Sequence, residues 1–276
     1  HPDRGLAMSG APAGGFHPRG PAWLITVIVT MAPWMEILDT TIVNVCLPHI
    51  AGSLSVSYDE ATWALTSYLV ANGIVVPVSG WLSRLLGRKR FFLICTAAFT
   101  FFSFLCGIAT SLEQLIAFRL LQGLFGGGLQ PSQQSIILDT YDPSQRHKGF
   151  SFVASAVIVA PIVGPTLGGW ITDAHSWRWV FLINVAFGLL AALGVAALLP
   201  RDDHKPNHYF DLQGFAYLAV GLASLQLMLD RGQTQDWFES TEIMIETMIA
   251  VLSLYLFVVH IRTTEHPFIS SRPFRD

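Results

Sequence analysis

Two carboxylates interrupt an apolar run of this sequence, in the segment Glu36-Ile37-Leu38-Asp39-Thr40-Thr41-Ile42-Val43-Asn44-Val45-Cys46-Leu47-Pro48. The run begins near Trp23 and is long enough to cross a lipid bilayer as a helix, which takes about 20 residues. A charge at that depth costs at least about 3 kcal/mol, so it is normally retained for a function and given a partner. The i, i+3 spacing places Glu36 and Asp39 on one helical face, with Thr40 and Asn44 beside them. We therefore expect the rest of the chain to supply this face with a cavity, a counter-charge and a hinge.

The composition of the chain is that of a membrane protein. Of its 276 residues, 52% are hydrophobic and 13% are charged, whereas soluble domains carry about 25% charged residues. The mean hydropathy is +0.49. The three cysteines, Cys46, Cys95 and Cys106, all lie in apolar segments, so neither a disulfide framework nor a zinc site is expected. The first twenty residues have no apolar core, so we expect no cleavable signal peptide there.

Apolar segments of bilayer-spanning length follow one another along the whole chain. They lie at about 22–47, 59–83, 90–110, 112–138, 146–172, 178–199, 212–230 and 241–261. The sequence therefore predicts an all-α polytopic membrane protein. Its expected parts are an N-terminal tail (1–21), a six-helix bundle (22–199), a polar linker (200–211), two further transmembrane helices (212–262) and a loop that looks cut (263–276).

Local signals mark several boundaries of these segments. Capping patterns and an N-cap precede three of them, at Ser57-x-x-Glu60, Ser111-x-x-Gln114 and Asp211. Three prolines are expected in or beside connecting loops, namely Pro48, Pro143 and Pro200.

The basic residues predict the orientation of the chain in the membrane. Thirteen of the 16 fall on one side: Arg4, Arg19, Arg84, Arg88, Lys89, Arg90, Arg146, Lys148, Arg201, Lys205, Arg262, Arg272 and Arg275. Arg178 and Arg231 fall on the other side, and Arg119 lies inside a segment. Because basic residues concentrate in cytoplasmic loops, both ends of the chain are predicted to be cytoplasmic.

The fourth segment offers a partner for the carboxylates. Arg119 begins a stripe of polar and small residues at helical spacing that continues with Gln122, Gly123, Gly126, Gln130, Gln133 and Gln134. Lipid cannot satisfy such a stripe, so it must face protein or a water-filled cavity. At a rise of about 1.5 Å per residue, Asp39 and Arg119 lie at similar depth, and we expect them to pair. The pair could serve function or only structure, although an apolar pair would hold the fold at less cost.

The fifth segment contains Ala160-Pro161-Ile162-Val163-Gly164-Pro165-Thr166-Leu167-Gly168-Gly169. Its prolines remove backbone hydrogen bonds and its glycines allow close approach of a neighbouring backbone. This pattern indicates a packing contact, a hinge or both. Between the second and third segments, the glycines of the loop Gly80–Arg90 suit a tight turn and its basic cluster suits a membrane surface.

Taken together, these stretches resemble the major facilitator superfamily, and within it the EmrB/QacA-type fourteen-span drug:proton antiporters. The loop Gly80–Arg90 is similar to the superfamily's loop motif, Arg119-x-x-Gln122-Gly123 to its span-4 motif, and Gly164-Pro165-x-x-Gly168-Gly169 to the span-5 antiporter motif. The opening segment resembles the span-1 motif of the fourteen-span family. The stretch Leu225–Phe238 resembles the EmrB branch.

The resemblance implies specific roles for residues of this chain. Asp39 and Arg119 would couple transport to protons. We add Glu36 to this set, because two neighbouring buried carboxylates titrate as a coupled pair. A substrate cavity would include Asn44, Asn72, Gln122, Gln130 and Gln133. Conformational motifs would include Gly80, Gly87, Arg88, Gly164, Pro165, Gly168 and Gly169.

The chain also departs from the family pattern. Ser83 stands where an acidic residue is usual, so an ion-pair latch at that loop is expected to be weaker or absent. Glu36 is an additional carboxylate, which argues against a scheme with a single proton site. Eight spans are present where fourteen are implied, so the chain is expected to be the N-terminal portion of such a protein and not to transport by itself.

The implied activity is exchange of inward protons for outward lipophilic, often cationic compounds across a bacterial inner membrane. Export of an endogenous metabolite, such as a siderophore or an antibiotic, would use the same motifs, and a transport-inactive scaffold or sensor is a third alternative. An enzyme is not expected, because the sequence offers no metal cluster, catalytic triad or phosphate loop. We expect no cofactor, no metal and no nucleic-acid partner.

The predicted outward loop Arg231–Glu239 carries Trp237 and Phe238. Such a pair is typical of an interfacial membrane anchor. The resemblance to the EmrB branch implies an alternative, contact with a periplasmic membrane-fusion adaptor that serves an outer-membrane channel. Aromatic side chains beside charges are a common composition for such contacts.

Overall fold

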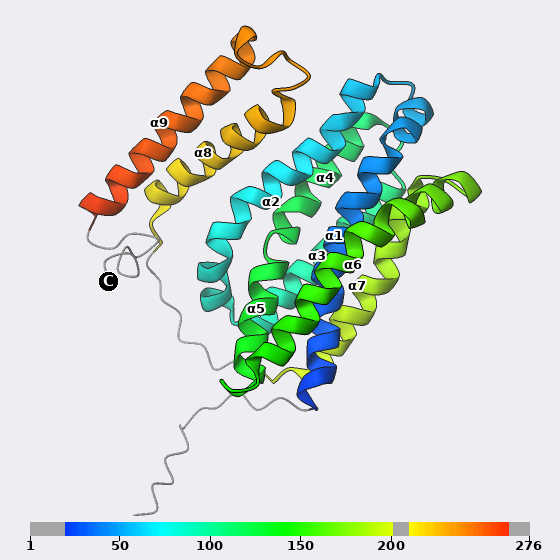
Figure 1. Cartoon of the computed structure of the whole chain (residues 1–276), viewed down its shortest axis with the longest axis vertical. Helices are drawn as coiled ribbons and strands as arrows, with labels where there is room; N and C mark the ends of the chain where they lie inside the picture. The colour runs from blue at the N-terminus through cyan, green and yellow to red at the C-terminus, as the bar shows by residue number, and fades with distance from the viewer. Residues whose placement is uncertain (1–19, 201–209, 265–276) are drawn as a thin grey trace, which may run out of the picture.

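The computed structural model describes residues 20–200 and 210–264, and throughout this part of the chain the regular structure is helical (Figure 1). The helices are α1 (Ala22–Leu54), α2 (Tyr58–Leu86), α3 (Arg88–Gly107), α4 (Leu112–Gly126), α5 (Leu129–Thr140), α6 (Arg146–Ala174), α7 (Arg178–Leu198), α8 (Leu212–Arg231), the short 3-10 helix η1 (Trp237–Glu239) and α9 (Thr241–Thr263). The predicted all-α class is confirmed. The predicted tail, linker and final loop fall largely outside the described residues, and with them Arg4, Arg19, Arg201, Lys205, Arg272 and Arg275.

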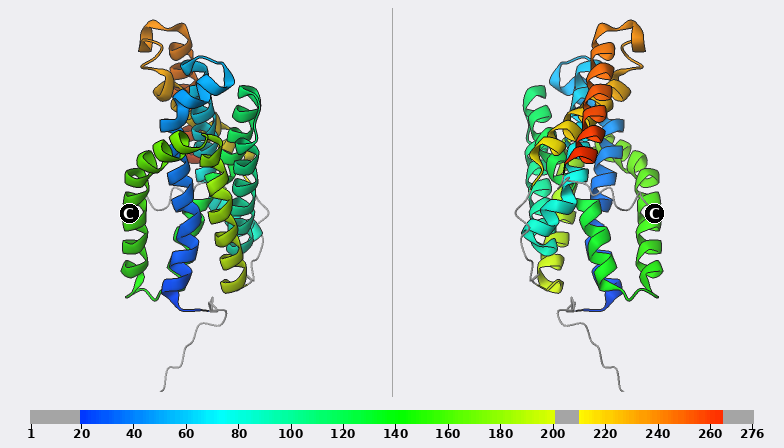
Figure 2. Two further views of the ribbon diagram at one scale, coloured as in Figure 1. Left: turned by 90° about the vertical axis from the view of Figure 1, so that its right-hand side faces the viewer. Right: turned by 90° about the vertical axis from the view of Figure 1, so that its left-hand side faces the viewer.

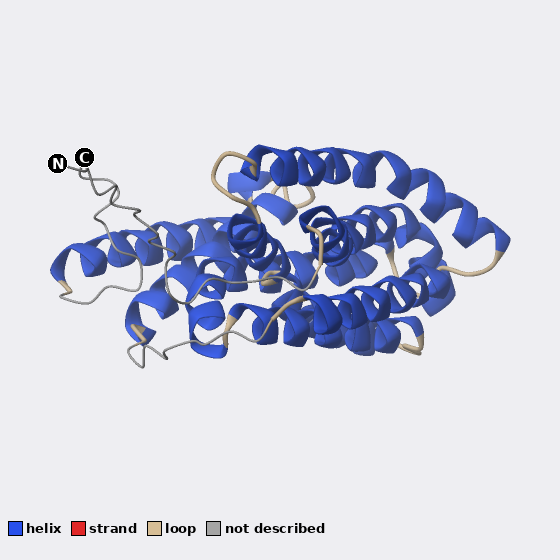
Figure 3. Cartoon of the chain, turned by 90° about the horizontal axis from the view of Figure 1, so that it is seen from below, coloured by secondary structure: helices blue, strands red, loops and turns tan. Residues whose placement is uncertain are grey.

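The helices α1–α7 form one bundle around α1. This helix packs against both α6 and α7, while α2 packs against α4, and α3 against α7 and α4. Figure 3, a view from below, shows helices joined by short loops throughout the described part of the chain. The α8–α9 hairpin lies beside the bundle, where α8 packs on α2 (Figure 1).

Seven of the described helices are long and apolar enough to cross a membrane, namely α1, α2, α3, α6, α7, α8 and α9. The predicted fourth span is divided between α4 and α5, which are about 22 Å and 18 Å long at a rise of 1.5 Å per residue. Each is too short to cross the roughly 30 Å hydrocarbon core alone, and together they cross it once.

The break between α4 and α5 corrects the prediction of one continuous helix over 112–138. Gly126, Gly127 and Gly128 have low helix propensity, and Pro131 has no N–H to donate to the carbonyl of Gly127. A Cβ at Gly128 would come within 2.7 Å of Cys95 Sγ, so the break allows close contact with α3.

A second correction concerns Pro48, which lies inside α1 and not in a loop. The helix continues because Ile50 and Ala51 bury apolar surface against the bundle, and it ends where Ser55 adopts a left-handed backbone conformation. Pro143 and Pro200 lie outside helices, as predicted.

The predicted helix starts are confirmed at all three positions. Ser57 and Glu60 form a complete capping box, and Asp211 accepts a hydrogen bond from the N–H of Gly214. Ser111 caps α4, but the side chain of Gln114 accepts from the N–H of Thr110 and not from that of Ser111.

The apolar core has two parts stacked along α1. One part includes Ile25, Met35 and residues of α3, α5 and α7, and the other includes Leu38, Ile50 and residues of α2, α4, α6 and α7. Glu36 and Asp39 lie on α1 where the two parts meet. The fold therefore surrounds these charges with apolar packing on both sides.

Candidate functional site

The centre of the site is an ion pair between α1 and α4. Arg119 Nη1 donates to Asp39 Oδ2 at 2.5 Å, and both side chains are fully buried. The pairing predicted from equal depth is confirmed. Because either charge alone would be very costly at this depth, the pair fixes the register of α4 against α1.

The second carboxylate oxygen of Asp39 has a partner on α7. Asn184 Nδ2 donates to Asp39 Oδ1 at 2.6 Å, and Asn184 also contacts Ser103 Oγ of α3 at 3.1 Å. Ser103 in turn donates to the carbonyl of Phe181 at 2.9 Å. Four helices thus meet at one carboxylate.

Arg119 is held by further groups around its guanidinium. Its Nη1 also donates to Gln122 Oε1 at 2.8 Å, and its Nε donates to the carbonyl of Ala64 on α2 at 3.1 Å. Its Cζ lies 4.1 Å from the centroid of the Tyr68 ring and 5.6 Å from that of Phe181. Such stacking on aromatic faces stabilises a buried cation.

Glu36 has a different environment, formed by neutral donors. Its Oε1 accepts from Asn72 Nδ2 at 2.7 Å and from the hydroxyl of Tyr68 at 3.3 Å. Its Oε2 accepts from Gln130 Nε2 at 3.5 Å. Glu36 is 5% exposed, and among the described residues no basic side chain pairs with it. The site therefore contains two carboxylates and one arginine.

Glycines of α4 allow α2 to approach the site closely. A Cβ at Gly123 would collide with the carbonyl oxygen of Tyr68, and one at Gly126 would lie 2.8 Å from the Tyr68 hydroxyl. Gly123 therefore lies against the α2 backbone and Gly126 against α2 side chains, while the larger residues of the predicted polar stripe form the hydrogen bonds.

The residues predicted to line a cavity fall into two groups. Asn44 and Gln130 are exposed and Asn72 is half-buried, so these three side chains are accessible from outside the bundle. Gln122 and Gln133 are instead buried, because Gln122 bonds Arg119 and Gln133 Nε2 donates to Thr30 Oγ1 at 2.8 Å. In this structure Gln122 holds the guanidinium of Arg119 within α4, Gln133 ties α5 to α1, and neither side chain faces an open space.

The glycine–proline motif of α6 makes a close contact with α1. A Cβ at Gly164 would collide with Thr41, and one at Gly168 would lie 2.8 Å from Ile42 Cγ2, whereas Gly169 has nothing within 4 Å. The helix stays continuous through Pro165 and bends in its second half (green in Figure 2). The packing interpretation is confirmed for Gly164 and Gly168, and the hinge stays a prediction.

Basic residues at the start of α3 hold the α2–α3 loop in place. Gly87 has a φ of 85°, which favours glycine, and Arg88 forms an ion pair with Asp139 of α5. Lys89 donates to the carbonyls of Ala196 and Leu199 at the end of α7, where a cation is favourable. An ion pair thus forms at this loop through Arg88 and Asp139, without a contribution from Ser83, and a latch weaker than the family's stays a prediction. Gly80 is exposed on α2.

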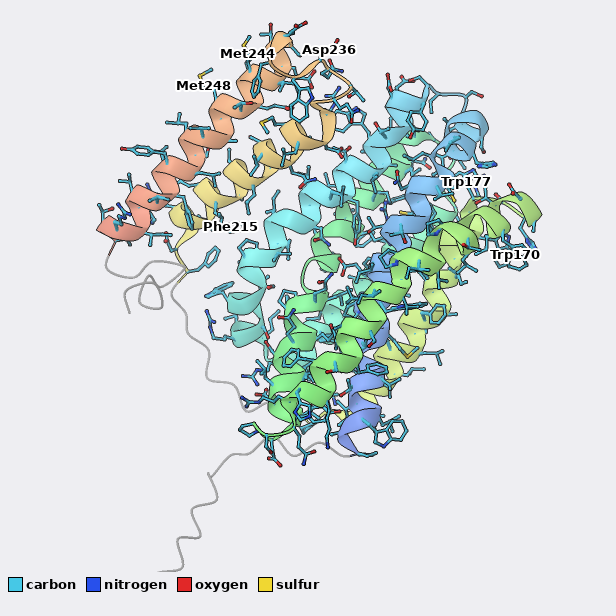
Figure 4. All side chains as sticks on the ribbon, viewed as in Figure 1. Trp170, Trp177, Phe215, Asp236, Met244 and Met248 are labelled. Carbon is cyan, nitrogen blue, oxygen red and sulfur yellow. The ribbon has the colours of Figure 1, made fainter. Side chains whose placement is uncertain are left out.

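The loop between α8 and α9 has an unusual backbone. Asp236 and Trp237 both have positive φ, at 56° and 52°, and Asp236 lies at the far end of the hairpin (Figure 4). The Trp237 N–H donates to the carbonyl of Gly232 at 2.8 Å, and a Cβ at Gly232 would lie 2.7 Å from the Trp237 ring. This packing leaves Phe238 60% exposed.

Polar contacts fix the hairpin to the bundle near that loop. Thr66 of α2 donates to Asp230 of α8, and the guanidinium of Arg231 lies 4.7 Å from the centroid of the Trp63 ring. On the opposite side of α9, Met244 and Met248 point away from the bundle (Figure 4). The hairpin therefore has one face against α2 and one apolar exposed face.

A lateral pocket of about 470 Å³ lies between α1, α6 and α7. Its lining includes Val27, Trp34, Phe152 and Phe187, and is almost entirely apolar. Sequence reasoning did not predict it, because it arises where α6 and α7 diverge on the two sides of α1 (Figure 2).

Three residues of the site were missed by sequence reasoning. Asn184 was an isolated polar residue in the interior of an apolar segment, and that isolation was the available signal, whereas Ser103 follows Thr96 and Thr100 in its segment and did not stand out. Tyr68 gave no such signal beyond its position one turn before Asn72. Among the described residues, no group of His, Cys, Asp and Glu side chains is arranged to hold a metal ion.

Comparison with known proteins agrees with this architecture. The family model described as Major Facilitator Superfamily matches residues 29–267. The Multidrug export protein EmrB of Haemophilus influenzae is 43% identical over 247 residues, which cover 89% of this chain and 48% of that protein. The Fatty acid resistance protein FarB of Neisseria gonorrhoeae is 39% identical over 256 residues, covering 92% of this chain and 50% of that protein.

The fold is also found among solved structures. The peptide transporter POT in complex with sulfate superposes with a TM-score of 0.64 at 18% identity, covering 90% of this chain and 53% of that chain. The chain spans about half the length of the curated relatives it matches.

Proposed function

This chain belongs to the major facilitator superfamily, and from that premise we propose that it supplies the N-terminal part of a multidrug efflux transporter. The proposed activity is export of lipophilic, often cationic compounds in exchange for protons. The observation that carries the proposal is the buried group of two carboxylates and one arginine in membrane-spanning helices.

Charge counting explains why such a group suits a cation and a proton. With both carboxylates ionised, Glu36, Asp39 and Arg119 together carry one net negative charge, which is costly inside a membrane. A monovalent cation or a proton can neutralise it, and the two therefore compete for the site. This competition couples export of one to entry of the other, as an antiporter requires.

Relatives support the choice of substrate class. Proteins named for multidrug export and for fatty acid resistance are similar to this chain over about half of their length. One name indicates export of several drugs, and the other indicates fatty acids, which are lipophilic. We therefore favour multidrug efflux over export of one endogenous metabolite.

We further propose that the protein lies in the bacterial inner membrane with the ends of this chain in the cytoplasm. The described basic residues near the α2–α3 loop and the start of α6 lie at one end of the bundle, and Arg178 and Arg231 at the other. The loop with Trp237 and Phe238 would then face the periplasm, where a membrane-fusion adaptor that leads to an outer-membrane channel could dock.

The test of the proposal uses Asp39→Asn in the full-length protein. We expect proton-driven efflux of a fluorescent lipophilic cation from membrane vesicles to fall at least about tenfold, because the change leaves Arg119 as an unpaired buried charge. Membrane insertion should stay intact, and Asp142→Asn in the exposed α5–α6 loop serves as the isosteric control. Purified Asp39→Asn protein that released as many protons on substrate binding as the wild type would sink the assignment.

A further inference from the structure

Tyr68 of α2 contacts both charged groups of the site. It is 1% exposed, its ring packs under the guanidinium of Arg119 at 4.1 Å, and its hydroxyl donates to Glu36 Oε1 at 3.3 Å. Asn72 Nδ2, which donates to the same oxygen of Glu36, lies 3.4 Å from the Tyr68 hydroxyl. One side chain therefore joins Glu36, which pairs with no basic side chain in the described part of the chain, to the arginine that pairs with Asp39.

We propose that Tyr68 is a positioning residue that couples Glu36 to the Asp39–Arg119 pair. This inference rests on the proposed function and adds a route by which its two carboxylates act as one unit. The Tyr68 hydroxyl interacts strongly with Glu36 only while Oε1 of the ionised carboxylate accepts its hydrogen bond. The face of the same ring packs against the guanidinium of Arg119. A change at Glu36 therefore alters the position of the ring, and with it the packing of Arg119 against Asp39.

The packing around Tyr68 gives this coupling its mechanical basis. The ring makes an edge contact with Phe99, with centroids 6.4 Å apart and an interplanar angle of 82°. The two glycines of α4, Gly123 and Gly126, leave no spare room at the carbonyl and the hydroxyl of Tyr68. In an interior packed this closely, movement at the hydroxyl cannot be absorbed by empty space and is passed on to neighbours.

A space-filling role is the competing explanation, and Tyr68→Phe separates the two. Phenylalanine keeps the ring under Arg119 and against Phe99, and removes only the hydroxyl, which donates to Glu36 and accepts from Asn72 Nδ2 at 3.4 Å. The matched control is Tyr141→Phe, because the Tyr141 hydroxyl also accepts a bundle hydrogen bond, from Thr26 Oγ1 at 2.9 Å, but lies outside the site.

The experiment measures binding of tetraphenylphosphonium to purified full-length protein, with the number of protons released per bound cation. Tyr68→Phe should weaken binding about tenfold, since it removes a hydrogen bond to a charged acceptor. In a Glu36→Gln background, Tyr68→Phe should weaken tetraphenylphosphonium binding by about threefold or less, since the acceptor is then neutral. Tyr68→Phe should also lower the number of protons released, and Tyr141→Phe should change neither quantity.

Two results would overturn the inference while leaving the proposed function intact. One is an equal loss of affinity from Tyr68→Phe in the wild-type and the Glu36→Gln backgrounds. The other is a Tyr68→Phe protein that releases as many protons per bound cation as the wild type. Both results require that the wild-type protein itself releases protons. Wild-type protein that neither binds the cation nor releases protons would remove the proposed function and the inference together. Thermal unfolding of each variant verifies that the fold is kept.

Discussion

At the scale of single residues, the two intramembrane carboxylates have different surroundings although they lie three positions apart. Asp39 is held by a cation and an amide, Arg119 and Asn184, while Glu36 accepts from neutral donors. Gln130, one of those donors, is exposed, so Glu36 lies closer to the surface beside the bundle. Glu36 is thus the carboxylate better placed to meet a cationic substrate.

The residue-scale prediction concerns Glu36→Gln. Glutamine keeps the size and the hydrogen-bond acceptor but loses the charge, so export of lipophilic cations should fall about tenfold, while export of neutral compounds changes by less than about threefold. Efflux of a matched cationic and neutral pair of dyes from vesicles measures the ratio. Glu239→Gln, in the exposed α8–α9 loop, is the control. Equal losses for both dyes would indicate a structural role for Glu36.

At the scale of helices, glycines set the distances in the bundle. Gly123 brings α4 against the α2 backbone, and Gly164 and Gly168 bring α6 against α1. In lipid there is no hydrophobic driving force between helices, so helices associate through the close van der Waals packing that small residues allow. The ion pair and the stacked Tyr68 ring form because these contacts hold the helices close together.

The prediction at this scale compares two glycines in helices. Gly123→Ala should destabilise the full-length protein by about 1–3 kcal/mol, because its Cβ would collide with the rigid backbone at Tyr68. Gly73→Ala should instead be neutral or stabilising by up to about 1 kcal/mol, since nothing lies within 4 Å of its Cβ. Thermal unfolding midpoints in detergent measure both. Equal midpoints for the two variants would contradict the close α2–α4 contact.

At the scale of the whole molecule, the bundle and the α8–α9 hairpin lie side by side, with charged residues in the loops at both ends of the helices. Contacts of Asp230 and Arg231 with α2 place the hairpin loop at the same end as the α1–α2 connection (Figure 1). The orientation of these helices in the membrane decides which loops face the cytoplasm.

The first prediction at this scale tests orientation by labelling with a membrane-impermeant thiol reagent. A cysteine at Gln233 should react in intact cells, and one at Ser144 only after permeabilisation, since positive loops stay inside. Both positions are exposed, and the native Cys46, Cys95 and Cys106 are buried, so the background is low. The reverse order of labelling would invert the proposed topology.

The second prediction concerns Trp237 and an adaptor. If the loop docks a membrane-fusion adaptor, a photo-crosslinker at Phe238, which is more exposed than Trp237, should capture that protein when the two are coexpressed. Trp237→Ala should lower adaptor co-purification about tenfold or more, as expected for an aromatic hot spot. Crosslinks to lipid alone, with co-purification unchanged, would leave the interfacial anchor as the interpretation.

By itself, the sequence determined the membrane class, the helix order, the family resemblance and the pairing of Asp39 with Arg119. Each of these follows from local patterns: apolar length, capping residues, motif spacing and the cost of an unpaired charge in a bilayer. Helix rise alone brought two distant charges to the same depth.

Only the tertiary structure decided which neighbours complete the site. Asn184 of α7 and Tyr68 of α2 meet the charges directly, and Ser103 of α3 contacts Asn184. No spacing along one helix encodes a contact across helices. The burial of Gln122 was missed for the same reason, whereas the break at Gly127 had a local signal in three consecutive glycines before Pro131. Propensity and periodicity describe one helix at a time, whereas contact is set by how closely neighbouring helices pack.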